Sequence, residues 1–235
     1  MNIAIIVAGG SGSRMQSARR KQYLDLGGEP VVVRTLRVFD TSLLIDRIVL
    51  VVPEDDRVFC REQLLAGAGL AKPVELVAGG RTRQASVFNG LQASDAAEDD
   101  LVVIHDAVRP FLRHAELAAC IETAGQKGAC ILALRAFDTL KQAAPDGRID
   151  GTIDRESVWL AQTPQVFHFA QILAAHTRAH RAGFTATDDA ALLEQAGQPV
   201  DIVPGSRLNI KITTREDLAL AAAIASFFQP DGNVQ

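Results

Sequence analysis

Cysteine and long apolar runs are both scarce in this chain of 235 residues. The three cysteines, Cys60, Cys120 and Cys130, are odd in number and have neither paired nor metal-ligand spacing, which favours free thiols in a reducing compartment. No apolar run reaches the length of a membrane span, and residues 1–3 lead into a strand pattern and not into a signal peptide. We therefore expect a soluble, cytoplasmic protein with no membrane partner.

Excess positive charge is also missing. The net charge is −4 and the isoelectric point is near 5.7, which argues against a protein that coats nucleic acid. The sequence has no Gly-x-Ser-x-Gly elbow, no Gly-Lys-Ser or Gly-Lys-Thr P-loop, and no His and Cys cluster with metal-ligand spacing. The length suits one domain with an excursion or two closely packed lobes, and with neither repeats nor a low-complexity linker we expect residues 1–235 to form a single domain.

Short β-branched runs alternate with helical patterns through the first 134 residues. Strands are predicted at 3–7, 47–52, 74–77, 101–105 and 129–134, and helices at 31–39, 57–65, 83–91 and 115–123. This alternation predicts an α/β fold, a Rossmann-like, mostly parallel twisted sheet with helices on both faces. Because such sheets bind ligands beyond the carboxyl ends of their strands, the loops after Val7, Val77 and His105 are the expected binding loops.

The pattern breaks at residues 135–162, where the turn signal Ala-Pro-Asp-Gly at 144–147 predicts a protruding β-hairpin arm. An isolated two-stranded ribbon is marginally stable, so the arm needs a packing partner, for which a second copy of the chain is a candidate. Its charged residues equally suit a solvated face.

Beyond the arm, helices are predicted at 170–181, at 188–195 with Thr187 as N-cap, and at 215–228 with a capping box of Thr213 and Glu216, and a strand at 200–203. Lys211 lies between Ile210 and Ile212 and should point away from both, towards water or a ligand.

Two loops rich in glycine and arginine follow predicted strands. The first, Ala-Gly-Gly-Ser-Gly-Ser-Arg-Met at 8–15 with Lys21 beyond it, suits a phosphate cradle of backbone N–H groups. It fails the dinucleotide fingerprint, because Met15 stands at the third glycine position and the ribose carboxylate is only loosely met by Glu54. The second contains Gly80 and Arg83, with Thr82 as the cap of the next helix. The alternatives are tight turns with solvated charges.

Asp106 follows the predicted central strand, where its carboxylate could hold a divalent cation shared with phosphates. Arg109 could bind an anion, and His105 is interpreted as a hydrogen-bonded structural histidine in preference to a base. The sequence thus combines cations on glycine loops with a carboxylate that could bind a metal, and it has no pattern of an activated nucleophile. This combination favours phosphoryl or nucleotidyl transfer, which depends on positioning and charge stabilisation. The residues alone indicate an enzyme that handles a nucleoside triphosphate.

Several segments resemble the 2-C-methyl-D-erythritol 4-phosphate cytidylyltransferase family, nucleotidyltransferases of the non-mevalonate isoprenoid pathway. The resemblance covers residues 3–228 and rests on segments 8–15, 21–24, 105–110, 138–141, 162–165 and 209–211. It implies an enzyme that transfers CMP from CTP to methylerythritol phosphate, giving the CDP-linked product and pyrophosphate. It also implies Mg²⁺ or another divalent cation as cofactor on the triphosphate.

The resemblance further implies roles for single residues. Arg14 and Lys21 would stabilise the charge that builds at the α-phosphorus, and Asp106 would serve both the metal and the substrate. The nucleotide would be held by Ala8, Gly9, Gly10, Gly12, Gly80, Arg83 and Ser86. Methylerythritol phosphate would be held by Asp106, Arg109, Thr139, Arg155 and Lys211, and the catalytic set would include Arg155 and Lys211. In the family the arm swaps across a homodimer, so Thr139 and Arg155 are expected to act on the neighbour's site.

The chain departs from the family's pattern at two positions. Arg20 stands where a proline is common, which loosens the loop, and Arg81 stands where an acidic residue is frequent. The alternatives are a sister cytidylyltransferase acting on ribitol 5-phosphate, an NAD-binding dehydrogenase, and a non-catalytic nucleotide-binding module. The acceptor contacts at Thr139, Arg155 and Lys211 favour the methylerythritol phosphate enzyme over the first of these.

Overall fold

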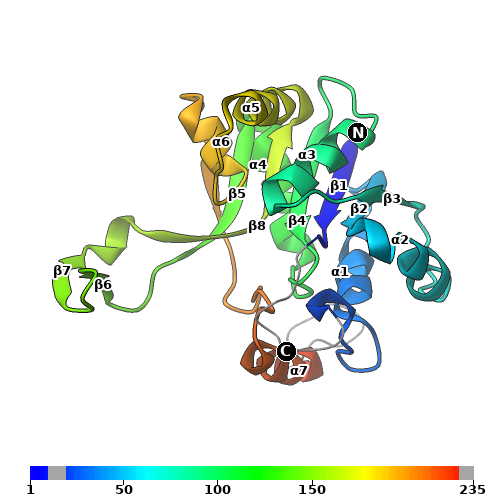
Figure 1. The fold of residues 1–235 in the computed structure, drawn as a ribbon, viewed down its shortest axis with the longest axis horizontal. Coiled ribbons are helices and arrows are strands. Elements are labelled where there is room, and N and C mark those ends of the chain that lie inside the picture. Colours follow the sequence, from blue (N-terminus) through cyan, green and yellow to red (C-terminus); the bar gives the residue numbers. More distant parts are fainter. Residues whose placement is uncertain (10–19, 228–235) are drawn as a thin grey trace.

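The computed structural model describes residues 1–9 and 20–227 and has the predicted α/β architecture (Figure 1). A seven-stranded sheet has the order β3-β2-β1-β4-β8-β5-β9, and every pairing is parallel except those of β8 with β4 and β5. Its strands are β1 (Asn2–Val7), β2 (Arg47–Val52), β3 (Val74–Ala78), β4 (Leu101–Asp106), β5 (Ala129–Arg135), β8 (Trp159–His168) and β9 (Asp201–Pro204). The five strands predicted in the first 134 residues are all confirmed, with bounds that shift by at most one residue.

Helices cover both faces of this sheet (Figure 1). The helices are α1 (Val31–Asp40), α2 (Arg57–Phe59), α3 (Arg83–Ala93), α4 (His114–Lys127), α5 (Phe169–Ala182), α6 (Ala190–Gln195) and α7 (Arg215–Phe227). Short helical turns are η2 (Lys21–Tyr23), η3 (Glu54–Asp56), the π-helical η4 (Cys60–Leu65) and η5 (Arg155–Ser157). None of the described helices is both long and apolar enough to cross a membrane.

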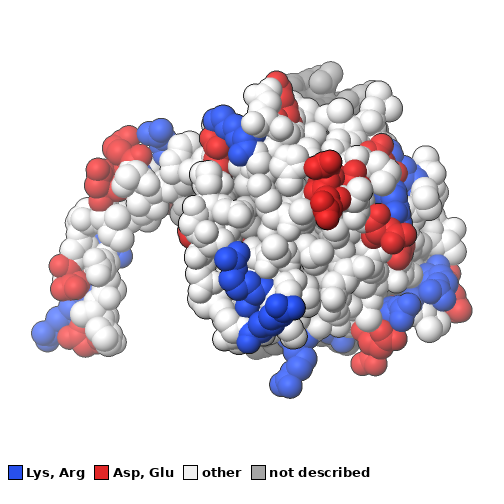
Figure 2. Space-filling view, turned by 90° about the horizontal axis from the view of Figure 1, so that it is seen from above, with Lys and Arg blue, Asp and Glu red and all other residues white. Residues whose placement is uncertain are grey.

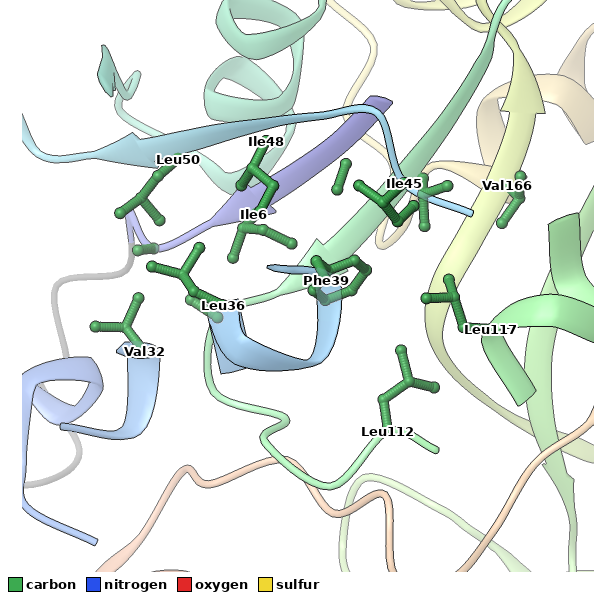
Figure 3. Packing of buried hydrophobic residues seen from close by; sticks show 14 of the residues in the cluster. Ile6, Val32, Leu36, Phe39, Ile45, Ile48, Leu50, Leu112, Leu117 and Val166 are labelled. Atoms are coloured by element: carbon green, nitrogen blue, oxygen red, sulfur yellow. The ribbon is translucent and has the colours of Figure 1, made fainter. Parts of the chain in front are cut away.

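The core has two main parts, one on each face of the sheet. One lies under α1 and α4, where Phe39 and Leu36 contact the face of the sheet that carries Ile6 (Figure 3). The other lies under α3, α5 and α6. Phe39 is fully buried, a burial worth about 1.5–3 kcal/mol for a side chain of this kind. The sheet is therefore held from both sides, and its strand ends form a rigid edge.

Helix α1 begins with three consecutive valines, Val31, Val32 and Val33, which are poor helix formers because β-branching restricts their rotamers. All three are buried: Val32 and Val33 face the sheet, and Val31 faces a third cluster formed with α7. Packing on two sides therefore determines this helix. It also carries Thr35, whose hydroxyl donates to the carbonyl of Ala107 at 2.8 Å and so fixes the loop after β4.

The segment between β5 and β8 contains a hairpin of β6 (Leu140–Ala143) and β7 (Ile149–Ile153) that projects from the body (Figure 1). Its turn has Gly147 at φ +85°, as the Ala-Pro-Asp-Gly signal predicts. The end of the predicted 135–162 segment lies in β8, since Trp159 pairs with Arg135 and Ala161 with Ala133 in the main sheet.

Two predicted helix caps are wrong by one residue. At the start of α6 the N–H of Ala191 donates to the carboxylate of Asp188 at 3.1 Å and not to Thr187, and the N-cap residue Asp189 makes no capping bond with its own side chain. Helix α7 is capped by Thr214 and Asp217 in place of Thr213 and Glu216, because the Asp217 carboxylate accepts from the N–H groups of both threonines. Asp217, which is shorter than Glu216 and lies one position later, thus makes with Thr214 the reciprocal bonds of a capping box.

Candidate active site

The predicted binding loops meet at one edge of the sheet. Val7, at the end of β1, pairs with Asp106 of β4 and with Val51 of β2. The ladder continues into the loops, as the Ala107 N–H donates to the Val7 carbonyl at 3.1 Å and the Ala8 N–H to the Val51 carbonyl at 2.8 Å. The central position of β4 therefore puts Asp106 beside the first glycine loop, as predicted.

The two glycine loops approach each other across Ser86 of α3. The Ser86 hydroxyl accepts from the Gly80 N–H at 3.1 Å, and a Cβ on Gly9 would lie 2.7 Å from the same oxygen. A Cβ on Gly80 would lie 2.5 Å from the Cβ of Ala85. Glycine is required here by close approach of the backbone. Thr82 caps α3 as predicted, accepting from the Ala85 N–H at 3.0 Å.

Three cations surround the buried carboxylate of Asp106. Arg83 donates through Nε to Oδ1 at 3.0 Å, and Lys211 lies 2.8 Å from Oδ2. Arg109 lies further away, with its Nε 3.6 Å from Oδ2. Burial opposes ionisation, yet the charges of Arg83, Lys211 and Arg109 hold the pKa of Asp106 well below its usual range. Asp106 is thus a permanent anion that collects cationic groups from three segments.

His105 has the structural role predicted for it. Its Nε2–H donates to the Arg109 carbonyl at 3.0 Å, and its Nδ1 accepts from the Thr163 hydroxyl at 3.1 Å. Burial lowers the pKa of His105 to about 4, so the ring is neutral. A fully buried, neutral imidazole with both nitrogens engaged fixes the loop after β4 and is not placed to act as a base.

Thr163 reaches the site because β8 bulges. Between the pairs Ile131–Gln165 and Ala133–Ala161, one residue of β5 faces three of β8. This bulge accommodates Pro164, which has no N–H to give to a ladder. It turns the Thr163 hydroxyl towards β4, where it also accepts from the Asp106 N–H at 3.1 Å.

The loop that carries Lys211 is held by the buried side chain of Asn209. Its side-chain amide donates to the Thr163 carbonyl at 2.9 Å, and the backbone carbonyl of Asn209 accepts from Nη1 of Arg109 at 2.7 Å. Ile212 is fully buried while Lys211 points to Asp106, as the alternation of apolar and polar residues predicts.

These groups line two adjoining cavities. The larger, about 400 Å³, is lined by Val7, Ala8, Lys21, Gln22, Arg83, Asp106, Val108, Lys211 and Thr213. The smaller, about 200 Å³, shares Arg83, Asp106 and Lys211 and adds Arg109, Thr163 and Thr187 among others. A larger and more open hollow of about 810 Å³ along α5 contains none of the predicted site residues. The predicted residues of the strand ends therefore form one continuous cleft centred on Asp106.

Some predicted site residues are not in this cleft. Thr139 and Arg155 lie on the exposed arm, which stands clear of the body in Figure 2. There the Arg155 guanidinium donates to the Phe137 carbonyl at 2.7 Å. Gly10, Gly12 and Arg14 lie outside the described residues.

Sequence reasoning missed Thr163, Asp189 and His176. Thr163 belongs to a segment that carries the family resemblance, but no local pattern gives it a role. Asp189 lies in the loop before α6 and binds Arg83 at 2.7 Å across 106 positions of sequence. A contact between such distant residues has no signal in a single sequence.

The described residues suit a divalent cation that is carried by the nucleotide. In the part of the chain that the structure describes, no three His, Cys, Asp or Glu side chains are placed to hold a metal. Mg²⁺ is commonly held by one or two carboxylates together with substrate phosphates, a role that Asp106 can fill. Because three cationic side chains surround Asp106, an ion there would need the negative charge of phosphate oxygens beside it.

Comparison with known proteins agrees with this geometry. Residues 2–226 match the family model described as IspD, 2-C-methyl-D-erythritol 4-phosphate cytidylyltransferase. The chain belongs to this family. A relative from Syntrophus aciditrophicus that bears the same description is 49% identical over 221 residues, which cover 94% of each chain.

Solved structures resemble the whole fold of this cytidylyltransferase family member. The 4-diphosphocytidyl-2C-methyl-D-erythritol synthase of Anaerococcus prevotii is 35% identical, with a TM-score of 0.83 over 96% of both chains. The 2-C-methyl-D-erythritol 4-phosphate cytidylyltransferase of Francisella tularensis is 31% identical, with a TM-score of 0.81 over 95% of this chain and 99% of that one.

The departure at Arg20 has a structural explanation. The backbone of Arg20 has φ −63° and ψ 142°, a conformation that proline also adopts. The Arg20 Nε lies 2.8 Å from Oδ2 of Asp56, and the Tyr23 hydroxyl donates to the same oxygen at 2.9 Å. The added charge is therefore paired with a carboxylate, and the proline-like backbone is retained. Arg81 is exposed.

Proposed function

We propose that this protein transfers CMP from CTP to 2-C-methyl-D-erythritol 4-phosphate and releases pyrophosphate, a step in isoprenoid precursor synthesis. Family membership over nearly the whole chain supports this activity. The observation that carries it is one cavity at the ends of the parallel strands, which Lys21, Arg83 and Lys211 line together with the buried carboxylate of Asp106. A triphosphate and a phosphate monoester bound in one cleft require such a concentration of cations.

The reaction is a direct displacement at phosphorus. A phosphate oxygen of the acceptor forms a bond to the α-phosphorus of CTP, the bond from that phosphorus to the bridging oxygen breaks, and pyrophosphate leaves with the electron pair. The acceptor phosphate is already an anion, so no side chain has to remove a proton. We assign Lys21 and Arg14 to stabilise the charge that builds on the α-phosphoryl oxygens. Lys21 lines the larger cavity, which supports this assignment.

We place the nucleotide in the larger cavity, on the backbone of the two glycine loops. Ala8 and Arg83 line this cavity, and Gly9 and Gly80 meet at Ser86 on the same two loops, the first of which continues in sequence with Gly10 and Gly12. Loops that carry no Cβ let N–H groups reach phosphate oxygens or a base edge. The divalent cation would be held by the triphosphate and by Asp106. Such a cation would neutralise part of the charge of the triphosphate.

We place methylerythritol phosphate in the smaller cavity. Lys211 and Arg109 offer charge to its phosphate, and the Asp106 carboxylate can accept hydrogen bonds from its hydroxyls. The three residues that the cavities share then lie between the two substrates. In this arrangement the acceptor's attacking oxygen and the α-phosphorus of CTP face each other where the two cavities adjoin, at Asp106.

We infer that the arm, residues 135–162 of a single domain of 235 residues, completes the site of a second copy in a homodimer. Its apolar side chains Phe137, Ile149 and Ile153 are 43%, 67% and 42% exposed, which favours a covering partner. Thr139 and Arg155 are on the same arm and outside the cleft of their own chain, so a neighbouring cleft is the site on which they can act. The buried free cysteines favour a reducing, cytoplasmic setting.

The test is pyrophosphate release by the purified protein with CTP and Mg²⁺, comparing methylerythritol phosphate with ribitol 5-phosphate. We expect release with methylerythritol phosphate alone. Release with ribitol phosphate alone would retain the chemistry and overturn the acceptor. Binding of NAD(H) in place of CTP would overturn the nucleotide assignment as well. CTP binding without release on either acceptor would support the non-catalytic module.

A further inference from the structure

A buried carboxylate that binds an imidazole and a guanidinium lies where α3, α5 and α6 meet. The carboxylate of Asp189, just before α6, accepts from Nε2–H of His176 on α5 at 3.1 Å and from Nη1 of Arg83 on α3 at 2.7 Å. The side chains of Asp189 and His176 are each 1% exposed. Burial opposes ionisation of Asp189, but Arg83 and the hydrogen bond from His176 keep its pKa below the usual value.

Arg83 connects Asp189 and His176 to the cleft. Its Nη1 binds Asp189 while its Nε binds Asp106 at 3.0 Å, so one guanidinium bridges two buried carboxylates from different elements. Asp106 in turn holds Lys211 at 2.8 Å. A continuous series of hydrogen bonds therefore runs from His176 on α5, through Asp189 and Arg83, to Asp106 and Lys211.

The far end of this chain is fixed on several sides. The N–H of Asp189 donates to Oε1 of Gln165 at 3.0 Å, which ties the loop to β8. The His176 ring lies parallel to Phe88 of α3, with centroids 6.1 Å apart and an interplanar angle of 2°. Asp189 is thus anchored independently of Arg83. With Nη1 on this anchored carboxylate and Nε on Asp106, the Arg83 guanidinium is held at two of its nitrogens, which fixes its orientation.

A buried ion pair is a poor means of stabilising a fold, because apolar side chains of similar size often serve equally well. Such pairs are better explained when the geometry of one partner matters. We propose that Asp189 and His176 are positioning residues of the cytidylyl transfer, which act by holding Arg83 in the orientation that serves the nucleotide and Asp106. This inference rests on the proposed function and adds two residues remote from the substrates to its machinery.

The experiment compares Asp189→Asn, Arg83→Ala and the double variant with a matched control, Asp40→Asn. Asp40 is also buried, but it accepts from the N–H groups of Ala71 and Lys72 at the end of α1, away from the cleft. An asparagine at 189 keeps the shape, but its amide faces one of the two donors and loses the charge. Steady-state kcat and KM for both substrates, CTP binding by calorimetry, and thermal unfolding are measured for all four variants.

We expect Asp189→Asn to lower kcat/KM for CTP on the order of tenfold, within the range that residues of one network produce. The control should stay within about twofold of the wild type, whatever either variant does to the unfolding temperature. When Arg83 is already alanine, adding Asp189→Asn should lower kcat/KM by a further factor of less than about two, because the group through which Asp189 acts is gone. Losses that multiply in the double variant, or equal losses in Asp189→Asn and Asp40→Asn, would overturn the positioning role.

His176→Phe provides a second route if Asp189→Asn does not fold. It keeps a ring against Phe88 and removes only the donor to Asp189, so we expect a loss of about threefold in kcat/KM for CTP. An unchanged kcat/KM in this variant would remove His176 from the proposal. A wild-type protein that releases no pyrophosphate would overturn the proposed function. The CTP affinities of the variants would still decide whether Asp189 positions Arg83.

Discussion

Acid should weaken this fold through His105 before its carboxylates respond. His105 is fully buried, its Nδ1 accepts from Thr163, and its ring lies 5.1 Å from that of Phe39. Protonation of Nδ1 would place its N–H against the Thr163 hydroxyl, which donates to this nitrogen in the neutral ring, and would leave a charge in an apolar setting. The folded state therefore resists a proton that the unfolded chain takes up at its ordinary pKa of 6.5.

The sign and size follow from the two pKa values of His105, 6.5 unfolded and about 4 folded. Between them the unfolded state binds more protons, so the free energy of unfolding falls as the pH falls, by up to about 1.4 kcal/mol per pH unit. From about pH 7.5 to about pH 4.5 the loss from His105 alone is about 2.5 kcal/mol. Asp106 and Asp189, whose pKa values are lowered, lose their stabilising contribution only below about pH 4.

The assay is urea unfolding followed by circular dichroism at several pH values, for the wild type and for His105→Gln, which cannot titrate. The wild type should lose about 2.5 kcal/mol over this range, and the variant should lose clearly less. Equal slopes for the two proteins would mean that His105 is not the group responsible. No loss at all in the wild type would refute the neutral, buried imidazole.

Three further predictions concern single positions and the arm. Lys21→Ala should leave the circular dichroism spectrum unchanged and lower turnover on the order of a hundredfold, and wild-type turnover in the folded variant would remove Lys21 from the chemistry. Gly90→Ala should lower the free energy of unfolding by about 1–3 kcal/mol, because its Cβ would lie 2.7 Å from Ile5 and 2.9 Å from Val51. Gly67→Ala, which meets nothing within 4 Å, should change it by less than about 0.5 kcal/mol in the same urea titration. Mixing the inactive proteins Arg14→Ala and Arg155→Ala should restore activity, since a mixed dimer holds one intact site, and no recovery despite subunit exchange would contradict the swapped arm.

The parallel half of the fold could be predicted because its signals are local. Runs such as Arg47–Val52 are apolar, β-branched and bounded by turn residues, so period and length identify them as strands. The position of Asp106 followed from the same logic, since it ends the strand that lies at the centre of the sheet. The resemblance to a family supplied the substrates, which no period or spacing contains.

Strand β8 shows where local signals end. Pro164 argues against a central strand, yet β8 lies between β4 and β5, because a bulge absorbs the missing donor. The antiparallel insertion follows from the long excursion through the arm, which returns the chain from the opposite direction. The bond of Asp189 with Arg83 depends on that return as well, as the Gln165 side chain that anchors Asp189 comes from β8.

The arm described above has a consequence for how much enzyme a cell must contain. If Thr139 and Arg155 serve the neighbour's cleft, no isolated chain has a complete active site, and activity per molecule becomes a function of protein concentration. Dilution through the dissociation constant of the dimer should then abolish turnover while each chain remains folded. A peptide or small molecule that covers the apolar side of the hairpin would act as an inhibitor without entering the cleft. Resistance to such an inhibitor could arise simply from making more of the protein.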